Sequence, residues 1–152
     1  MDQFSRVRTE FNNLNSLRFE LKPEGVIDKI GKLFIGQDIK VGNAKFDKQY
    51  HLKGSDASKI KSIFSSEKIQ NLIYNLIYVK LELFEIDRNN SQNSSITNSV
   101  LYYKVDIELT CQNQFNDLLE LFKTLIDNLE RLELISPLRP AANSGQKAKR
   151  AD

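Results

Sequence analysis

Apolar and polar residues alternate strictly over Leu101–Leu109, and this is the clearest pattern in the chain. Every odd position is Leu, Tyr, Val or Ile, and the even positions carry Tyr, Lys, Asp and Glu. Such alternation predicts a strand with one buried and one wet face, as in an antiparallel sheet. A second strand is expected over Val79–Ile86. Its apolar phase slips late in the segment, which predicts a bulge at Leu83–Glu85.

Helical spacing of apolar residues marks the longest predicted element, Asn113–Ile135. One stripe faces a single direction at about 100° per residue, and its members are Phe115, Leu118, Phe122, Leu125, Leu129 and Leu132. Leu121 and Leu134 lie well off that stripe. Either a further helix covers Leu121, or both residues form an exposed patch that marks a partner surface. We favour the exposed patch and take Leu121 and Leu134 as the candidate interaction surface.

The patterns of the N-terminal half predict shorter elements. The spacing of Phe4, Val7, Phe11 and Leu14 predicts a helix over Asp2–Leu14, and alternation predicts a strand over Leu17–Lys22 that Pro23 ends. A short helix is expected between Gly25 and Gly36. Two helical stripes follow in Ser55–Leu76, with Asp56 or Ser55 as a cap and a break at Ser65–Glu67.

The segment Asp38–Lys53 is expected to be extended, with a turn at Gly42-Asn43, because both residues tolerate positive φ. After the turn, Phe46 and Tyr50 supply apolar contacts. Asp47 follows Phe46 and is placed to accept hydrogen bonds from nearby backbone amides. We therefore expect a structural motif made of Gly42, Asn43, Phe46, Asp47 and Tyr50.

This motif resembles a Gly-Asp-x-x-Phe-Asp-x-x-Phe turn found in uncharacterised bacterial domains, in which the turn leads into a strand and then a helix. The resemblance covers about Leu17–Leu76. Asn43 stands here for the first Asp, and Tyr50 stands for the second Phe. The resemblance implies a bacterial source and carries no established activity. Some of those domains resemble cytoplasmic parts of membrane-anchored proteins.

These elements predict an α+β fold. We expect a two-layer sandwich in which a mostly antiparallel sheet of about four strands has helices on one face. The chain has 152 residues, of which 40% are hydrophobic, enough for a single domain over residues 1–136. Residues 137–152 hold Pro, Ala, Gly and Lys and little to bury, so a disordered basic tail is expected there.

Composition narrows the function classes. The formal net charge is +2; the tail holds four basic residues and one acidic residue, so the rest is nearly neutral and gives no reason to expect a nucleic-acid partner. No apolar run approaches the roughly 18–20 residues that span a bilayer, and Met1–Phe11 does not resemble a secretory signal. A single cysteine excludes an internal disulfide. We therefore expect a soluble, cytoplasmic protein.

Reactive residues are few. Cys111 precedes a helix, but the one histidine, His51, lies far away in sequence, so a small buried thiol is the better interpretation. Asp38, Asp47 and Asp56 lack the spacing of a calcium loop, and capping and turn roles fit them better. No phosphate-binding loop or zinc pattern is present. The sequence thus offers no catalytic, metal or cofactor residue.

We therefore expect a non-enzymatic binding or assembly module, with a homodimer or another protein as its partner. The first alternative is a small-molecule or lipid-binding domain with a pocket between sheet and helix. A further alternative is an enzyme that uses the carboxylates of Asp38–Asp56. A flat apolar patch would favour the module, and a deep apolar cavity would favour the ligand-binding domain.

Overall fold

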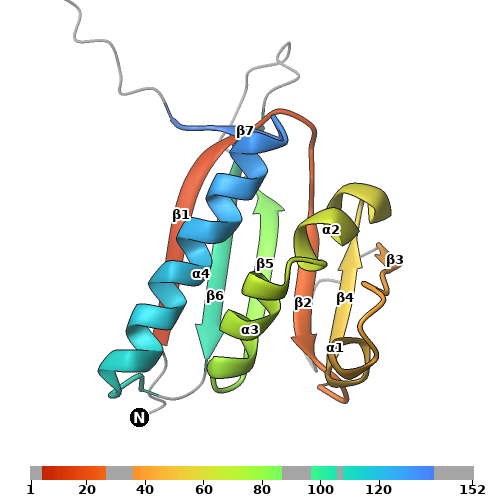
Figure 1. Ribbon diagram of the computed structural model, residues 1–152. Coiled ribbons are helices and arrows are strands. Elements are labelled where there is room, and N and C mark those ends of the chain that lie inside the picture. The colour runs from red at the N-terminus through yellow and green to blue at the C-terminus, as the bar shows by residue number, and fades with distance from the viewer. Residues whose placement is uncertain (1–4, 27–35, 87–96, 106–107, 139–152) are drawn as a thin grey trace, which may run out of the picture.

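The structure is a computed structural model that describes residues 5–26, 36–86, 97–105 and 108–138. Eleven elements occur in these ranges (Figure 1). The strands are β1 (Ser5–Asn13), β2 (Phe19–Pro23), β3 (Gln37–Asp38), β4 (Tyr50–Gly54), β5 (Lys80–Glu85), β6 (Thr97–Val105) and β7 (Ile135–Ser136). The helices are α1 (Ala44–Gln49), α2 (Ala57–Phe64), α3 (Glu67–Asn75) and α4 (Gln112–Arg131).

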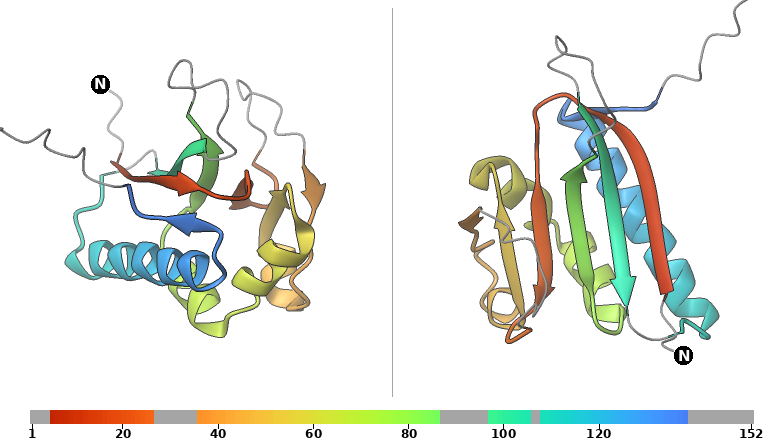
Figure 2. Two further views of the ribbon diagram at one scale, coloured as in Figure 1. Left: turned by 90° about the horizontal axis from the view of Figure 1, so that it is seen from above. Right: turned by 180° about the vertical axis from the view of Figure 1, so that it is seen from behind.

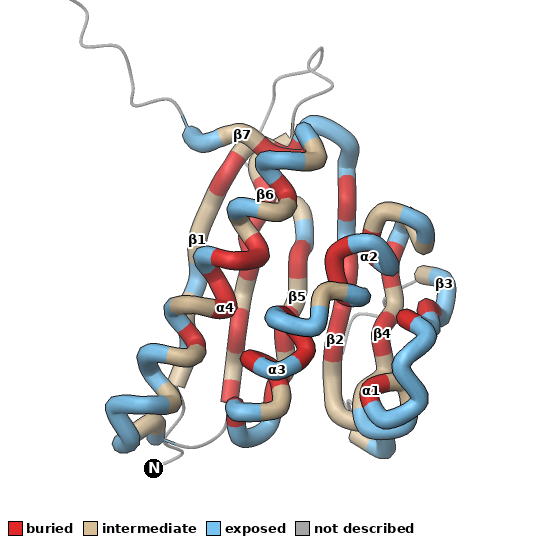
Figure 3. Tube along the Cα trace, viewed as in Figure 1, coloured by how far each residue is buried: buried red, intermediate tan, exposed pale blue. Residues whose placement is uncertain are grey.

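The seven strands form one antiparallel sheet in the order β3-β4-β2-β5-β6-β1-β7. The helices lie on one face of the sheet, as the view from above shows (Figure 2). The core fills the space between the two layers, and buried residues recur along the inner strands and along the sheet-facing sides of the helices (Figure 3). The expected α+β class with an antiparallel sheet is confirmed, but the sheet has seven strands rather than about four.

The helix predicted over Asp2–Leu14 is wrong, because Ser5–Asn13 forms β1. Val7 and Phe11 are four residues apart. Residues at this spacing share one face of a helix, and they also share one face of a strand. Pairing decides between the two. All nine residues of β1 pair with β6, from Ser5 with Val105 to Asn13 with Thr97.

The bulge predicted at Leu83–Glu85 is also wrong. β5 pairs with β6 in unbroken register from Lys80 with Lys104 to Glu85 with Ser99. Phe84 therefore keeps its place in the alternation and points to the open face of the sheet. There its ring meets that of Tyr102 edge-on, at 6.3 Å between centroids, which explains an apolar residue at a wet position.

The end of α4 differs from the predicted boundary at Ile135. The helix ends at Arg131, and Glu133 follows with φ of +54°. The backbone N–H of Glu133 then donates to Glu130 at 2.8 Å, and that of Leu134 donates to Leu129 at 2.9 Å. This is a left-handed helix end, here without glycine. It turns the chain back toward the sheet, where β7 pairs with Asn12 and Asn13 of β1.

The break expected between two helices at Ser65–Glu67 is confirmed: α2 ends at Phe64 and α3 begins at Glu67. The Asp56 cap is also confirmed, since its carboxylate accepts from the Lys59 amide at 3.1 Å. This bond and the Lys59 ammonium lower the pKa of Asp56. Most of the helix expected between Gly25 and Gly36 and most of the expected tail lie outside the described residues.

Tyr103 gives a stability prediction at the centre of the sheet. Its side chain is fully buried, and its hydroxyl has no hydrogen-bond partner among the described residues. Burial raises the pKa of the Tyr103 hydroxyl to about 12. Because Tyr103→Phe removes a buried polar group without orphaning a partner, we expect stability to stay within about 1 kcal/mol of wild type or to rise. Urea denaturation measures this, and a loss of about 2 kcal/mol or more would show that the hydroxyl is hydrogen-bonded.

Candidate functional site

The Gly42–Tyr50 motif is a structural turn that begins a helix. Both carboxylate oxygens of Asp47 accept backbone N–H bonds, from Val41 at 2.8 Å and from Gly42 at 3.0 Å. Gly42 has φ of +95°, which a residue with a side chain rarely adopts. Phe46 is buried, and its ring centroid lies 5.0 Å from that of Tyr50. The expectations that Phe46 is core and that Asp47 bonds its own turn are confirmed.

Asn43 corrects the expectation of an extended segment over Asp38–Lys53. Its side-chain oxygen accepts from the amides of Lys45 and Phe46, so it caps α1, which occupies the middle of that segment. The Asn43 amide group also donates to Gln70 of α3 at 2.6 Å. Gln70 in turn donates to the carbonyl of Phe64 at 2.8 Å, so the cap is tied to both α2 and α3.

An open hollow of about 500 Å³ lies beside this motif, between the start of α1 and α3. The residues that line it are mostly polar: Val41, Gly42, Asn43, Lys45, Ser65, Glu67, Gln70, Asn71 and Tyr74. The Lys45 ammonium lies 4.4 Å from the centre of the Tyr74 ring. Burial and the nearby Asp47 carboxylate raise the pKa of Tyr74. None of the lining residues belongs to a strand, so the hollow is not a pocket between sheet and helix.

The other reactive residues do not converge. Asp38 lies 3.1 Å from Nε2 of His51, while Asp47 serves the turn and Asp56 caps α2. Within the described ranges, no group of three or more His, Cys, Asp and Glu side chains could hold a metal ion. Cys111 stands immediately before α4, where it is exposed and its side chain makes no capping bond. The expectation that this thiol is buried is therefore wrong.

The expected interaction surface at Leu121 and Leu134 is wrong. Their exposed fractions are 0% and 2%. Leu121 lies on the side of α4 that packs against α3, where Lys68 and Glu120 form an ion pair at 2.7 Å. Leu134 is folded back by the end of α4, and its carbonyl accepts from Leu14 at 2.9 Å. Neither residue forms a partner surface, because neighbouring elements cover both.

A different part of α4 is apolar and exposed. Phe115 is 42% exposed and Leu119 is 46% exposed, and Ile126 is partly buried. At about 100° per residue these three lie within about 40° of one another, and about 100–140° around the helix from Glu120, which pairs with Lys68 of α3. We call these three residues the α4 flank. Figure 1 shows α3 to one side of α4 and β1 toward the other side. A flank turned away from α3 therefore lies on the β1 side of the helix.

β1 is nearly the last strand on that side of the sheet. Its only further neighbour among the described strands is β7, which pairs with Asn12 and Asn13 alone. We call the backbone of residues 5–11, on the side away from β6, the β1 edge. Arg8 and Glu10 form an ion pair on the open face of this strand. Ser5 accepts from the Leu109 amide at 3.0 Å, which holds the segment leading into α4 beside the start of β1.

The helix α4 and the strand β1, which carry the α4 flank and the β1 edge, lie at the same end of the molecule, one in each layer (Figure 2). An extended segment seated on the β1 edge would continue the sheet, and its inward side chains would reach the α4 flank. The α4 flank and the β1 edge together replace Leu121 and Leu134 as the candidate interaction surface, and the name refers to them from here on. The sequence indicated that α4 contributes to such a surface, but Phe115 was assigned to the buried stripe and Leu119 was not singled out.

Comparison with protein-family models, curated proteins and solved structures finds no match to this chain. Among the described helices, none has both the length and the apolar composition needed to span a membrane. The proposed function therefore rests on the geometry of the candidate interaction surface.

Proposed function

We propose that this chain is a non-enzymatic protein-binding module that captures an extended segment of a partner on the β1 edge. The observation that carries the proposal is the coincidence of the β1 edge with the exposed α4 flank. Main-chain hydrogen bonds to an edge strand supply affinity, and alternate side chains of the added strand supply specificity. The inward side chains of the partner would pack on Phe115 and Leu119.

The two ends of the sheet differ in a way that favours β1. At the opposite end, β3 is only two residues long, and short edge strands are a common protection against unwanted pairing. β1 is nine residues long, and β7 lies against two of them. Exposed apolar side chains beside an edge strand are tolerated in monomers when they serve a partner.

A second candidate function is the binding of a small polar molecule in the hollow beside α3. Its volume of about 500 Å³ lies in the range of ligand sites. Asn43, Lys45 and Asn71 place donors on its lining, and Glu67 places an acceptor there. Its polar lining favours a water-soluble ligand over a lipid.

The proposed function is tested with random nine-residue peptides displayed on phage and selected on the immobilised chain. Selected peptides are then titrated into isotope-labelled protein, and amide chemical shifts locate the site. We expect the largest shifts in β1 and the α4 flank, and loss of binding in Leu119→Lys. Lys61→Glu, on an exposed part of α2 away from the α4 flank, is the control and should bind normally. Shifts confined to the hollow residues Asn43, Lys45 and Asn71 would instead support the second candidate function.

A further inference from the structure

We propose that the segment bound by the β1 edge is β1 of a second copy of this chain, related by a two-fold axis that passes beside Thr9. This inference rests on the proposed function and names its partner. The resulting dimer would have one continuous sheet built from both copies.

Two-fold symmetry restricts the registers of such a pairing. In an antiparallel pair, residues directly opposite each other point to the same face of the sheet. A symmetric pair therefore has one residue opposite its own copy, and each other residue pairs reciprocally. For β1 the available centres are Val7, Arg8, Thr9 and Glu10, because β7 already pairs with Asn12 and Asn13.

Charge separates these four registers. A centre at Arg8 or Glu10 sets like charges directly opposite each other on the axis, and a centre at Val7 sets Arg6 opposite Arg8. Like charges directly opposite are destabilising. A centre at Thr9 sets Arg8 opposite the partner's Glu10, and it does so twice.

The Thr9 register is also compatible with an ion pair that is already present within one chain. Arg8 and Glu10 pair along their own strand. In the dimer each guanidinium would adjoin one carboxylate of its own strand and one of the partner, so the four charges alternate in sign. The paired stretch runs from Val7 to Phe11. Because β7 covers Asn12 and Asn13, the partner's Ser5 and Arg6 must turn away from the sheet edge in this register.

The same register places both helix layers on one face. Thr9, Val7 and Phe11 share the side of β1 that faces the helices, since Val7 and Phe11 pack into the core. The α4 helices of the two copies would then lie on the same face of the joined sheet. Each would direct its flank, Phe115 and Leu119, toward the other copy. Backbone pairing, charge and apolar surface therefore all favour the same partner.

Sedimentation equilibrium of the full chain tests the inference with charge-reversal variants. We expect wild type to dimerise, and Arg8→Glu and Glu10→Arg each to raise the dimer dissociation constant by about tenfold or more, because each change sets like charges together twice. An equimolar mixture of the two variants should dimerise again, since one strand then carries only carboxylates and the other only guanidinium groups at these positions. Lys61→Glu, on an exposed part of α2, changes the net charge as much as Arg8→Glu and should have no effect.

Folding of each variant is checked by circular dichroism. The Arg8 side chain is 55% exposed, so Arg8→Glu is expected to fold. If Glu10→Arg does not fold, Leu119→Lys replaces it, and this variant should weaken the wild-type dimer without unfolding the chain. The register is tested by mild oxidation of Thr9→Cys in a Cys111→Ser background. An intermolecular disulfide is expected there and not for Ser58→Cys, which lies on an exposed part of α2.

The outcomes separate the inference from the proposed function. At about 1 mM protein, a dimer with a dissociation constant of about 1 mM or less is populated. A wild type that is monomeric at this concentration overturns self-pairing. Peptide-induced shifts in β1 would still support the proposed function. A dimer that is unchanged by Arg8→Glu overturns the inference and assigns the dimer to another surface. A dimer that the charge variants disrupt, in which Thr9→Cys does not cross-link, overturns the Thr9 register.

Discussion

Replacing Phe46 with alanine will lower the free energy of unfolding by about 3–5 kcal/mol, the usual cost of truncating a core aromatic residue. Phe46 is buried, and its ring contacts those of Tyr50 and Tyr74, with centroids 5.0 and 6.1 Å away. The turn that carries Phe46 is fixed by Asp47, so it cannot readily close over the cavity.

Chemical denaturation measures the effect of Phe46→Ala, with Phe115→Ala as the control. Phe115 is also a phenylalanine on a helix, but it is exposed and is expected to cost less than about 1 kcal/mol. Equal losses for the two variants would contradict the assignment of Phe46 to the core and of Phe115 to the surface.

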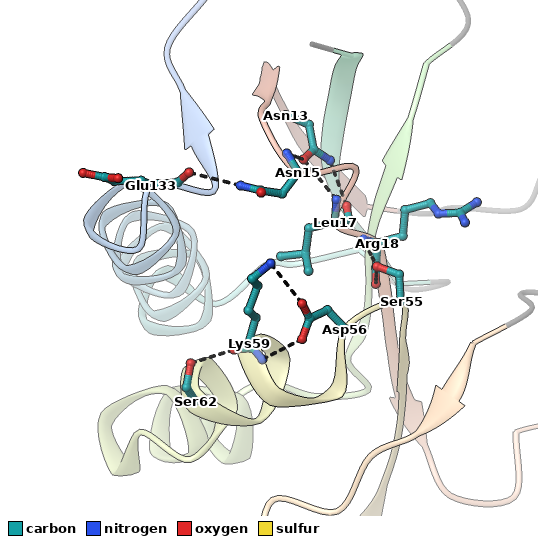
Figure 4. Close-up of polar contacts among 9 residues, drawn as sticks. All are labelled: Asn13, Asn15, Leu17, Arg18, Ser55, Asp56, Lys59, Ser62 and Glu133. Carbon is teal, nitrogen blue, oxygen red and sulfur yellow. Dashed lines mark hydrogen bonds and ion pairs between the residues drawn. The ribbon is translucent and has the colours of Figure 1, made fainter. Parts of the chain in front are cut away.

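Replacing Asn13 with alanine will cost about 2–4 kcal/mol, because the side chain satisfies several buried polar groups at once. Its amide group donates to the carbonyl of Leu17 at 2.8 Å and to the Ser99 hydroxyl at 3.0 Å. Its oxygen accepts from the amides of Leu17 at 3.0 Å and Asn15 at 3.2 Å (Figure 4). These bonds shape the connection from β1 to β2.

Asn12 provides the matched control for Asn13. It is the neighbouring residue in β1, but it is only partly buried, and its bonds to Ser136 and Pro137 are long, at 3.5 and 3.3 Å. Asn12→Ala should therefore cost less than about 1 kcal/mol. The interpretation of Asn13 fails if thermal and urea denaturation give the two variants the same stability.

The second half of the fold could be predicted from sequence because its patterns have a single interpretation. The strand expected over Leu101–Leu109 overlaps β6, and the helix expected from Asn113 overlaps α4. β1 was misassigned because Val7 and Phe11 satisfy two periods, and only long-range pairing with β6 distinguishes them. The turn at Gly42-Asn43 had two interpretations as well, since asparagine is common both in turns and at helix caps.

The candidate interaction surface could be predicted only in part. The apolar residues on α4 were too numerous for one face of the sheet to cover all of them, which indicated that part of the helix contacts something else. Their angular positions do not say which flank α3 will cover, so Leu121 was predicted to be exposed and Phe115 to be buried, the reverse of what the structure shows. The β1 edge has no signature in the sequence, because it depends on the order of strands in the sheet.

Amide hydrogen exchange of the full chain at low and high protein concentration tests the central claim most directly. We expect the amides that join the β1–β6 ladder to exchange slowly at both concentrations. The β1 amides of Val7–Phe11 that point away from β6 are predicted to exchange more slowly at high concentration, together with reduced solvent access at the α4 flank, while α1 and α3 stay unchanged. Exchange in β1 that does not depend on concentration, or protection that appears around α1 and α3 instead, would contradict pairing at the β1 edge.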